Sequence, residues 1–185
     1  MAGAEFKPTA LPDVVRITPE VFSDNRGTFC EVWNARRFKA NGLTVDFVQD
    51  NACFSRCGVL RGLHYQVSQA QGKLVRVVQG EIFDVAVDVR KNSPTLGTWV
   101  AETLSADNGA ALWIPPGFAH GYFVQSDCAV VTYKCTNFYA PEFERAIRWD
   151  DPELAIEWPI PEGSAPIVSD RDSSALRFVD AETVT

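Results

Sequence analysis

Short apolar runs separated by regularly spaced turns restrict this chain to a mainly β fold. Residues 81–89 (EIFDVAVDV) alternate between two faces of a predicted strand, with Phe83, Val85, Val87 and Val89 on one face and Ile82, Asp84, Ala86 and Asp88 on the other. Further strands are predicted at residues 73–78, 121–125 and 129–135, with turn residues at 91–94, 106–109 and 115–117. Short strands with turns at this spacing are typical of a β-sandwich or barrel.

Helices are expected to be few and short. Residues 31–41 (EVWNARRFKAN) are the best helix candidate, with Gly42 placed at the C-terminal cap. The chain from about residue 140 is rich in proline and acidic residues, and we expect loops and one short helix there.

Composition narrows the class of protein further. A chain of 185 residues predicts a single domain spanning residues 1–185, and its 46% hydrophobic content is enough for a sizeable core. Without an apolar run of 18 residues, no membrane span is expected. A net charge of −7 argues against nucleic-acid binding, although a local basic pocket can still hold a small phosphate ligand. The first residues lack a signal pattern and the five cysteines show no metal or redox spacing, so we expect a cytoplasmic protein with reduced thiols.

Three cationic or proton-transferring side chains fall within one short apolar segment. Arg61, His64 and Lys73 would be costly to bury together unless an anion binds among them, which favours an anion site that contains a base. A histidine in a strand is more often structural, so the prediction depends on the other two residues. Arg61 and His64 are three apart and would face opposite sides of a regular strand. Gly62 lies between them, and a bulge there would bring both to one face.

The stretch 113–121 (WIPPGFAHG) resembles the second sequence motif of the cupins, with His120 at the metal-ligand position. Most cupins add two histidines from a first motif, but here that position reads His64-Tyr65-Gln66, so the second histidine is absent. His64 and His120 are the only histidines of the chain, and metal sites usually offer three or four good protein ligands. We therefore expect neither a metal nor another cofactor.

Nine ordered blocks resemble the dTDP-4-dehydrorhamnose 3,5-epimerase family, a metal-free branch of the cupins. They are residues 47–51 (FVQDN), 58–64 (GVLRGLH), 71–75 (QGKLV), 83–88 (FDVAVD), 93–95 (SPT), 104–106 (LSA), 113–115 (WIP), 117–121 (GFAHG) and 133–136 (YKCT). The resemblance runs from about residue 22 to about residue 172. It implies a cupin-like jelly-roll sandwich and a homodimer whose N-terminal segment is exchanged between subunits.

The resemblance also implies an activity and its catalytic groups. The family inverts C3 and C5 of dTDP-4-dehydro-6-deoxy-D-glucose, whose C4 ketone acidifies both positions, in the biosynthesis of dTDP-rhamnose for cell-surface polysaccharide. This chemistry needs a base, a group that stabilises the enolate oxygen, and an acid on the opposite face of the sugar. His64 matches the base, Lys73 the enolate stabiliser and Tyr133 the acid. Asp172 matches the carboxylate that orients the base, with Asp170 as the alternative.

Nine further positions match substrate contacts of the family: Arg26, Glu31, Gln49, Asn51, Arg61, His120, Tyr139, Glu144 and Arg171. Arg61 matches a pyrophosphate contact, where a guanidinium can bind two oxygens at once. Arg26 is placed on a phosphate of the neighbouring subunit's site. Tyr139 matches the aromatic residue that stacks on thymine, and Phe138 beside it is the alternative.

Two rival functions remain compatible with the sequence. A monofunctional 3- or 5-epimerase, or a 3,4-ketoisomerase, would use the same pocket and return protons differently. A sugar-binding cupin without activity is the more remote alternative, because a binding protein has no use for an acid and a base on opposite faces.

Overall fold

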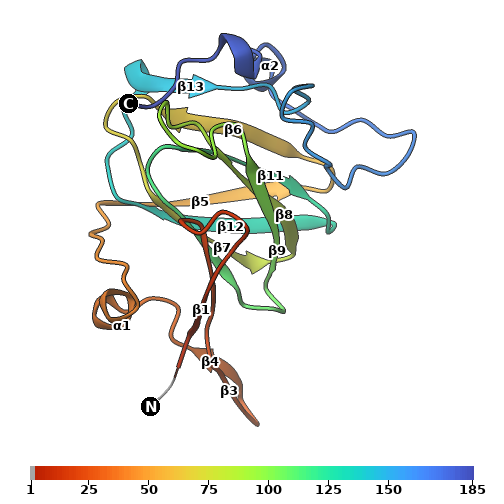
Figure 1. The fold of residues 1–185 in the computed structure, drawn as a ribbon. Coiled ribbons are helices and arrows are strands. Elements are labelled where there is room, and N and C mark those ends of the chain that lie inside the picture. Colours follow the sequence, from red (N-terminus) through yellow and green to blue (C-terminus); the bar gives the residue numbers. More distant parts are fainter. Residues whose placement is uncertain (1–2) are drawn as a thin grey trace.

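The computed structural model describes residues 3–185 and consists mainly of two facing antiparallel sheets (Figure 1). The six-stranded sheet has the order β1-β2-β10-β7-β12-β5, and the five-stranded sheet has the order β13-β6-β11-β8-β9. The bounds of the strands in these sheets are β1 Glu5–Pro8, β2 Val15–Thr18, β5 Gln49–Arg56, β6 Leu60–Gln66, β7 Lys73–Gln79, β8 Glu81–Asp88, β9 Trp99–Ser105, β10 Ala111–Ile114, β11 Phe118–Val124, β12 Cys128–Cys135 and β13 Glu144–Ala146. The predicted mainly β sandwich is confirmed.

Alternation along the strands builds the core between the sheets. In β8, Ile82 and Ala86 point into this core while Val85 and Val87 pack on the outer face, as the pattern of the sequence predicts. Asp84 shares the inner face and is fully buried. A buried carboxylate among apolar neighbours needs hydrogen-bond partners, so its position marks a polar site inside the sandwich.

Part of the outer face of each sheet is covered. The C-terminal segment places Ile147, Leu154 and Trp158 over the five-stranded sheet. On the six-stranded sheet, Phe38 of helix α1 (Ala35–Ala40) packs with Trp113 of β10. The C-terminal segment and α1 thus pack on the outside of the sheets, and the space between the sheets stays separate from both.

The bulge predicted at Gly62 is present. His120 of β11 lies opposite His64, whereas Tyr122 lies opposite Arg61, so β6 contains one extra residue at this point. Gly62 has φ +121°, and a Cβ atom added there would lie 2.5 Å from the Cα of Gly121. Glycine is therefore required by both the backbone conformation and the close approach of the two strands.

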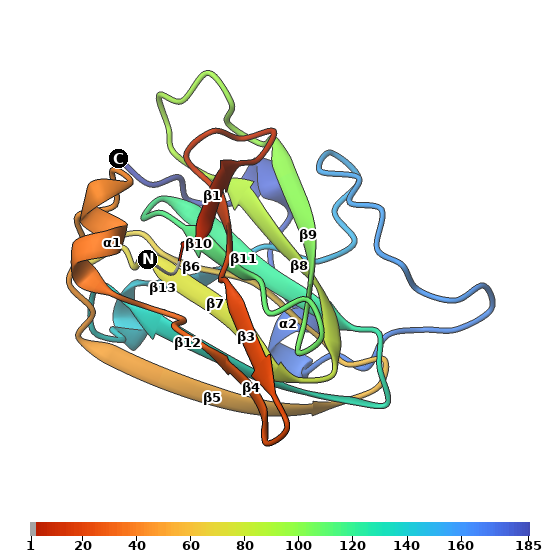
Figure 2. The ribbon, with the colours of Figure 1, turned by 90° about the horizontal axis from the view of Figure 1, so that it is seen from below.

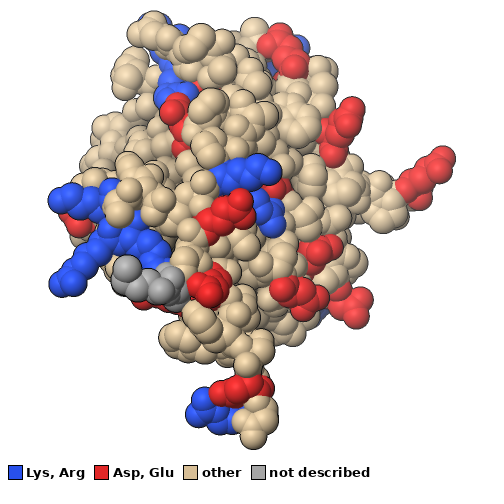
Figure 3. Space-filling model, turned by 60° about the horizontal axis from the view of Figure 1, so that its bottom comes forward, with Lys and Arg blue, Asp and Glu red and all other residues tan. Residues whose placement is uncertain are grey.

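Helix α1 is shorter than the predicted span of residues 31–41. The side chain of Asn34 accepts hydrogen bonds from the backbone N–H groups of Arg36 and Arg37, which starts the helix at Ala35. The helix ends at Ala40 with Asn41 as its C-cap, and Gly42 follows with φ +85°. Lys and Arg side chains gather over this helix (Figure 3).

The other boundaries differ less from the expectations. Strand β11 begins at Phe118, three residues before the predicted start at residue 121. The short C-terminal helix is confirmed as α2 (Asp170–Ser173), and the strand β13 was not expected there. Two single-turn 3-10 helices, η1 (Pro141–Phe143) and η2 (Phe178–Asp180), complete this region. Among residues 3–185, no helix is long and apolar enough to cross a membrane.

One hairpin projects from the body of the molecule. Strands β3 (Val21–Asp24) and β4 (Gly27–Cys30) pair only with each other and lie at the opposite end of the molecule from α2 (Figure 1). Figure 2 shows the hairpin from below, in front of the sheets. Phe22 and Phe29 on this hairpin are 44% and 70% exposed. A two-stranded hairpin is at best marginally stable alone, so this one requires a covering surface.

Candidate active site

His64 and Asp172 form a hydrogen-bonded pair at the inner face of the five-stranded sheet. The distance from His64 Nε2 to Asp172 Oδ1 is 2.7 Å, and the backbone N–H of Gly62 donates to Asp172 Oδ2 at 3.3 Å. The hydroxyl of Ser169 caps helix α2 by accepting from the N–H of Asp172, which fixes the carboxylate at the first turn. Burial acts to raise the pKa of Asp172, but these hydrogen bonds prevail and hold it below its ordinary value. In this structure the carboxylate bonded to His64 is that of Asp172, whereas Asp170 is exposed.

A second buried pair lies on the neighbouring strands. His120 of β11 bonds through Nε2 to Asp84 Oδ1 of β8 at 2.7 Å. Burial lowers the pKa of His120, and Asp84 partly opposes this shift. Within the described chain, the other oxygen of Asp84 is buried without a hydrogen-bond partner. An unpaired buried carboxylate oxygen is costly, so it is available to a donor on a bound molecule.

Lys73 and Tyr133 face these pairs from the six-stranded sheet. Lys73 begins β7, and its Nζ lies 3.5 Å from the backbone oxygen of His64. Burial lowers the pKa of Lys73, and Cys135, Asp84 and Glu144 partly restore it. Tyr133 of β12 is partly buried against the inner core. Burial raises the pKa of Tyr133, so its hydroxyl keeps the proton at neutral pH. His64 and Tyr133 therefore approach the interior from opposite sheets.

A polar rim surrounds this centre. Gln49 Oε1 accepts from the backbone N–H of Tyr139 at 2.9 Å, and Gln49 Nε2 donates to Asn51 Oδ1 at 3.1 Å. Tyr139 donates to Glu144 at 2.6 Å, and Arg171 of α2 pairs with the same carboxylate at 2.7 Å. Phe138 and Tyr139 are 61% and 50% exposed, so either ring is free to stack on a ligand.

Arg61 also faces the interior, because its Nε donates to Ser55 Oγ of β5 at 3.1 Å. Only one of its donors is used in this bond, which leaves the planar guanidinium free to bind an anion. The predicted common face for Arg61 and His64 is confirmed.

Two of the expected substrate residues do not join this cluster within one protomer. Arg26 sits at the tip of the projecting hairpin, where its 85%-exposed side chain pairs with Asp24. Glu31 lies between the hairpin and α1 and binds Asn34 and Arg37. Charges of both signs lie at the tip of the projecting hairpin (Figure 3).

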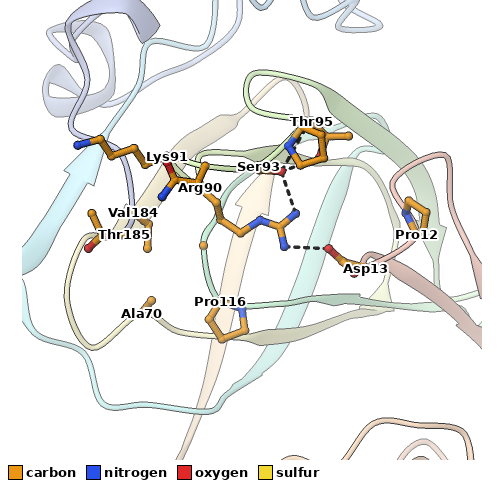
Figure 4. Close-up of a pocket in the computed structure, with 13 residues that line it drawn as sticks. Pro12, Asp13, Ala70, Arg90, Lys91, Ser93, Thr95, Pro116, Val184 and Thr185 are labelled. Carbon is orange, nitrogen blue, oxygen red and sulfur yellow. Dashed lines mark hydrogen bonds and ion pairs between the residues drawn. The ribbon is translucent and has the colours of Figure 1, made fainter.

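A pocket of about 760 Å³ lies elsewhere, beside the C-terminus (Figure 4). Arg90 lines it, donating to Asp13 at 2.8 Å and to the buried carboxylate of Asp88 at 2.7 Å. Ser93 and Thr95 also donate to Asp88, and these bonds fold the loop after β8. The charged groups of Arg90 and Asp88 are therefore engaged with each other.

The side chains around His64 and His120 do not form a metal site. Each histidine already binds an aspartate through Nε2, and no group of three His, Cys, Asp or Glu side chains among residues 3–185 is placed to hold an ion. Sequence reasoning missed Asp84 as the partner of His120. The signal in the sequence was Asp84 between Ile82 and Ala86 on the inner face of a predicted strand.

Fold and centre together define a cupin-like jelly roll that carries paired acid–base groups where most cupins carry metal ligands. The family model described as dTDP-4-dehydrorhamnose 3,5-epimerase matches residues 8–180. The enzyme of that name from Pseudomonas aeruginosa is 56% identical over 174 residues, covering 94% of this chain and 95% of its own. The chain belongs to the dTDP-4-dehydrorhamnose 3,5-epimerase family.

Solved structures agree with this assignment. A dTDP-6-deoxy-D-glucose-3,5-epimerase from Legionella pneumophila, in complex with dTDP-4-keto-L-rhamnose, superposes with a TM-score of 0.94 at 46% identity, covering 97% of this chain and 95% of the other. A 3′-monoepimerase from Streptomyces bikiniensis, in complex with dTDP-quinovose, has a TM-score of 0.87 at 32% identity and covers 94% of this chain and 87% of its own. The cupin-like jelly roll and the family resemblance are both confirmed.

Proposed function

We propose that this protein is a cofactor-independent isomerase that inverts C3 and C5 of dTDP-4-dehydro-6-deoxy-D-glucose, giving dTDP-4-dehydro-L-rhamnose. The observation that carries this proposal is the His64–Asp172 pair facing Tyr133 from the opposite sheet, with Lys73 beside it. Inversion at a carbon requires removal of a proton from one face and delivery to the other. Two groups on opposite walls of the interior meet that requirement.

His64 acts as the base. Its Nε2 bonds to Asp172, which leaves Nδ1 to take the proton from the carbon next to the ketone. The C–H electrons move into the ketone and form an enolate. The imidazolium that results is stabilised by the ionised carboxylate of Asp172. The same base serves C3 and C5, because both flank one carbonyl.

Lys73 stabilises the enolate oxygen. Its ammonium is held in the buried interior, where a fixed positive charge favours the developing oxyanion more than it would in water. Tyr133 then gives its proton to the opposite face of the carbon. Proton exchange with solvent returns His64 and Tyr133 to their starting states. No electrons are lost or gained overall.

The rim binds the nucleotide end of the substrate. Arg61 suits the pyrophosphate, and Arg171 adds a second positive charge from α2. Gln49, Asn51 and Glu144 contact the sugar and base, and Tyr139 or Phe138 stacks on the thymine. His120 completes the sugar side with Asp84 behind it.

The test of this function is His64→Ala. This variant should abolish hydrogen exchange at both C3 and C5, by a factor of about 10² or more, while thermal unfolding and dTDP binding stay normal. Exchange that persists at either carbon would mean that a different base serves that position.

We also propose that the enzyme works without a metal. The donor set supports this, because both histidines are committed to aspartates. EDTA should leave the rate unchanged, and elemental analysis of active protein should find no stoichiometric transition metal. Activity lost on chelation and restored by one metal would contradict the proposal.

The active form is proposed to be a cytoplasmic homodimer in which the N-terminal segment completes the partner's site. The unsupported β3–β4 hairpin with exposed Phe22 and Phe29 supports this arrangement, as does the position of Arg26 at its tip. Arg26 and Glu31 would then touch the substrate bound by the other subunit.

Subunit mixing tests the exchange. Arg26→Ala and His64→Ala homodimers should each be impaired. A mixed dimer contains one site with His64 from one chain and Arg26 from the other, so mixing should restore activity. Mixtures that stay as inactive as their parents would place Arg26 in its own subunit's site or outside the site altogether.

One alternative function also has support: inversion of a single carbon, because a 3′-monoepimerase shares the fold at 32% identity. It predicts exchange and inversion at one carbon only.

A further inference from the structure

Gln66 is a buried side chain that the proposed mechanism does not use, at the position where most cupins carry a second metal-binding histidine. It ends β6, two residues after His64, so both side chains point to the same face of the strand. Tyr65 between them packs on the outer face of the sheet. Gln66 is only 4% exposed, and a buried carboxamide needs hydrogen-bond partners.

The carboxamide of Gln66 holds the backbone on both sides of Tyr139. Its Oε1 accepts from the N–H of Ala140 at 3.0 Å, and its Nε2 donates to the carbonyl oxygen of Phe138 at 3.3 Å. The same Nε2 also donates to the carbonyl oxygen of Gln69 at 2.8 Å. An amide nitrogen carries two hydrogens, so both donors are used and three bonds fix the side chain.

Two further glutamines bond the same segment, which belongs to no helix or strand. Gln49 Oε1 accepts from the N–H of Tyr139 at 2.9 Å, and Gln71 Nε2 donates to the carbonyl oxygen of Asn137 at 2.9 Å. Side chains thus replace the backbone partners that a sheet would supply. The backbone is held while the two aromatic rings that it carries stay exposed.

We propose that Gln66 is a positioning residue for nucleotide binding, which fixes the segment carrying Phe138 and Tyr139 so that one ring meets the base of the nucleoside diphosphate sugar. This inference rests on the proposed stacking of one of these rings on the thymine. A ring on a fixed backbone loses less conformational freedom when the ligand binds, which strengthens binding without a new contact.

The experiment compares Gln66→Met with the parent enzyme. Methionine keeps the length of glutamine but removes all three hydrogen bonds. The Kd of dTDP and the KM of the sugar nucleotide should each rise about tenfold, with kcat within about twofold, because the lost contact serves ground state and transition state equally. The Kd of inorganic pyrophosphate should not change, because pyrophosphate has no base to stack. Isothermal titration calorimetry and steady-state kinetics measure these quantities.

Tyr65→Phe is the matched control on the same strand. The Tyr65 hydroxyl donates to the carbonyl oxygen of Glu182 at 2.6 Å, so this variant also loses a hydrogen bond but leaves the nucleotide segment untouched. Thermal unfolding should shift in both variants, whereas dTDP affinity should fall only in Gln66→Met. If Gln66→Met does not fold, Gln66→Asn decides by the same criteria, because its amide is one carbon too short to reach both backbone groups.

Normal dTDP affinity in Gln66→Met would overturn the inference. Equal losses of dTDP and pyrophosphate binding would also overturn it, because they would show that Gln66 holds the whole site rather than the nucleotide segment. A double variant, Phe138→Ala with Tyr139→Ala, separates the inference from the proposed stacking. In that background Gln66→Met should weaken dTDP binding no further, since the rings that it positions are gone. A double variant that binds dTDP as tightly as the parent would overturn the stacking itself, and the inference with it.

Discussion

At the residue scale, base and acid lie on opposite sheets, so substitutions of Tyr133 and Lys73 should affect proton exchange and product formation differently. Tyr133→Phe should still exchange protons on the face of His64, so deuterium enters the substrate while inverted product falls by about 10². Lys73→Ala should suppress exchange and product together, because no proton leaves without stabilisation of the enolate. Mass spectrometry of substrate recovered from D₂O measures both quantities. Inversion at nearly the normal rate in Tyr133→Phe would remove that residue from the mechanism.

Substitution of each of the two aspartates of α2 tests, also at the residue scale, which carboxylate orients His64. Asp172→Asn should slow the reaction by about tenfold or more, because the amide neither fixes the tautomer of His64 nor balances the imidazolium. Asp170→Asn, two residues away and exposed, should leave the rate within about twofold, since surface substitutions rarely disturb a site. Steady-state rates of the two variants decide the point. The reverse order would show that the wrong carboxylate has been paired with His64.

At the element scale, the crossing of β6 and β11 sets the position of His64. A Cβ added at Gly121 would lie 2.7 Å from the backbone oxygen of Arg61 and 3.0 Å from a Leu63 methyl. Gly121→Ala should therefore displace β6, lowering the free energy of unfolding by about 1–3 kcal/mol and reducing kcat. Urea unfolding and steady-state kinetics measure these effects. Gly42→Ala, where an added Cβ meets nothing within 4 Å, should leave kcat unchanged.

The elements also show what the sequence can and cannot predict. Residues 73–78, 81–89 and 129–135 were predicted as strands because alternation and β-branched residues carry a local signal. The bulge was predicted because Gly62 separates two side chains that the chemistry needs on one face. The start of α1 was wrong because Asn34 was not recognised as its cap. The partner of His120 was missed, since strands that lie far apart in sequence bring Asp84 beside it.

At the scale of the whole molecule, a buried carboxylate makes stability depend on pH. Burial acts to raise the pKa of Asp88, but hydrogen bonds from Arg90, Ser93 and Thr95 prevail and lower it from 3.8 to about 2. A depressed carboxylate pKa contributes stability that is complete above the unfolded-state value and is lost as the pH falls toward the folded-state value. Asp88 should therefore stabilise the protein at neutral pH and cease to do so between about pH 4 and pH 2.

Asp88→Asn tests this linkage. The variant should lose on the order of 2 kcal/mol at pH 7, and the difference from the parent should shrink as the pH falls to 3. Urea unfolding at both pH values measures it. Asp107→Asn, on an exposed turn, serves as the control and should have the same free energy of unfolding as the parent at both pH values. A constant difference at pH 7 and pH 3 would contradict the linkage.

The central claim is that one His–Asp pair and one facing tyrosine invert two carbons beside a single ketone. Proton NMR of dTDP-4-dehydro-6-deoxy-D-glucose incubated with the parent enzyme in D₂O measures this most directly, because it reports exchange and configuration at each carbon separately. We expect deuterium at both C3 and C5, with both centres inverted and no metal added. Exchange and inversion confined to one carbon would contradict the claim and identify a monofunctional epimerase.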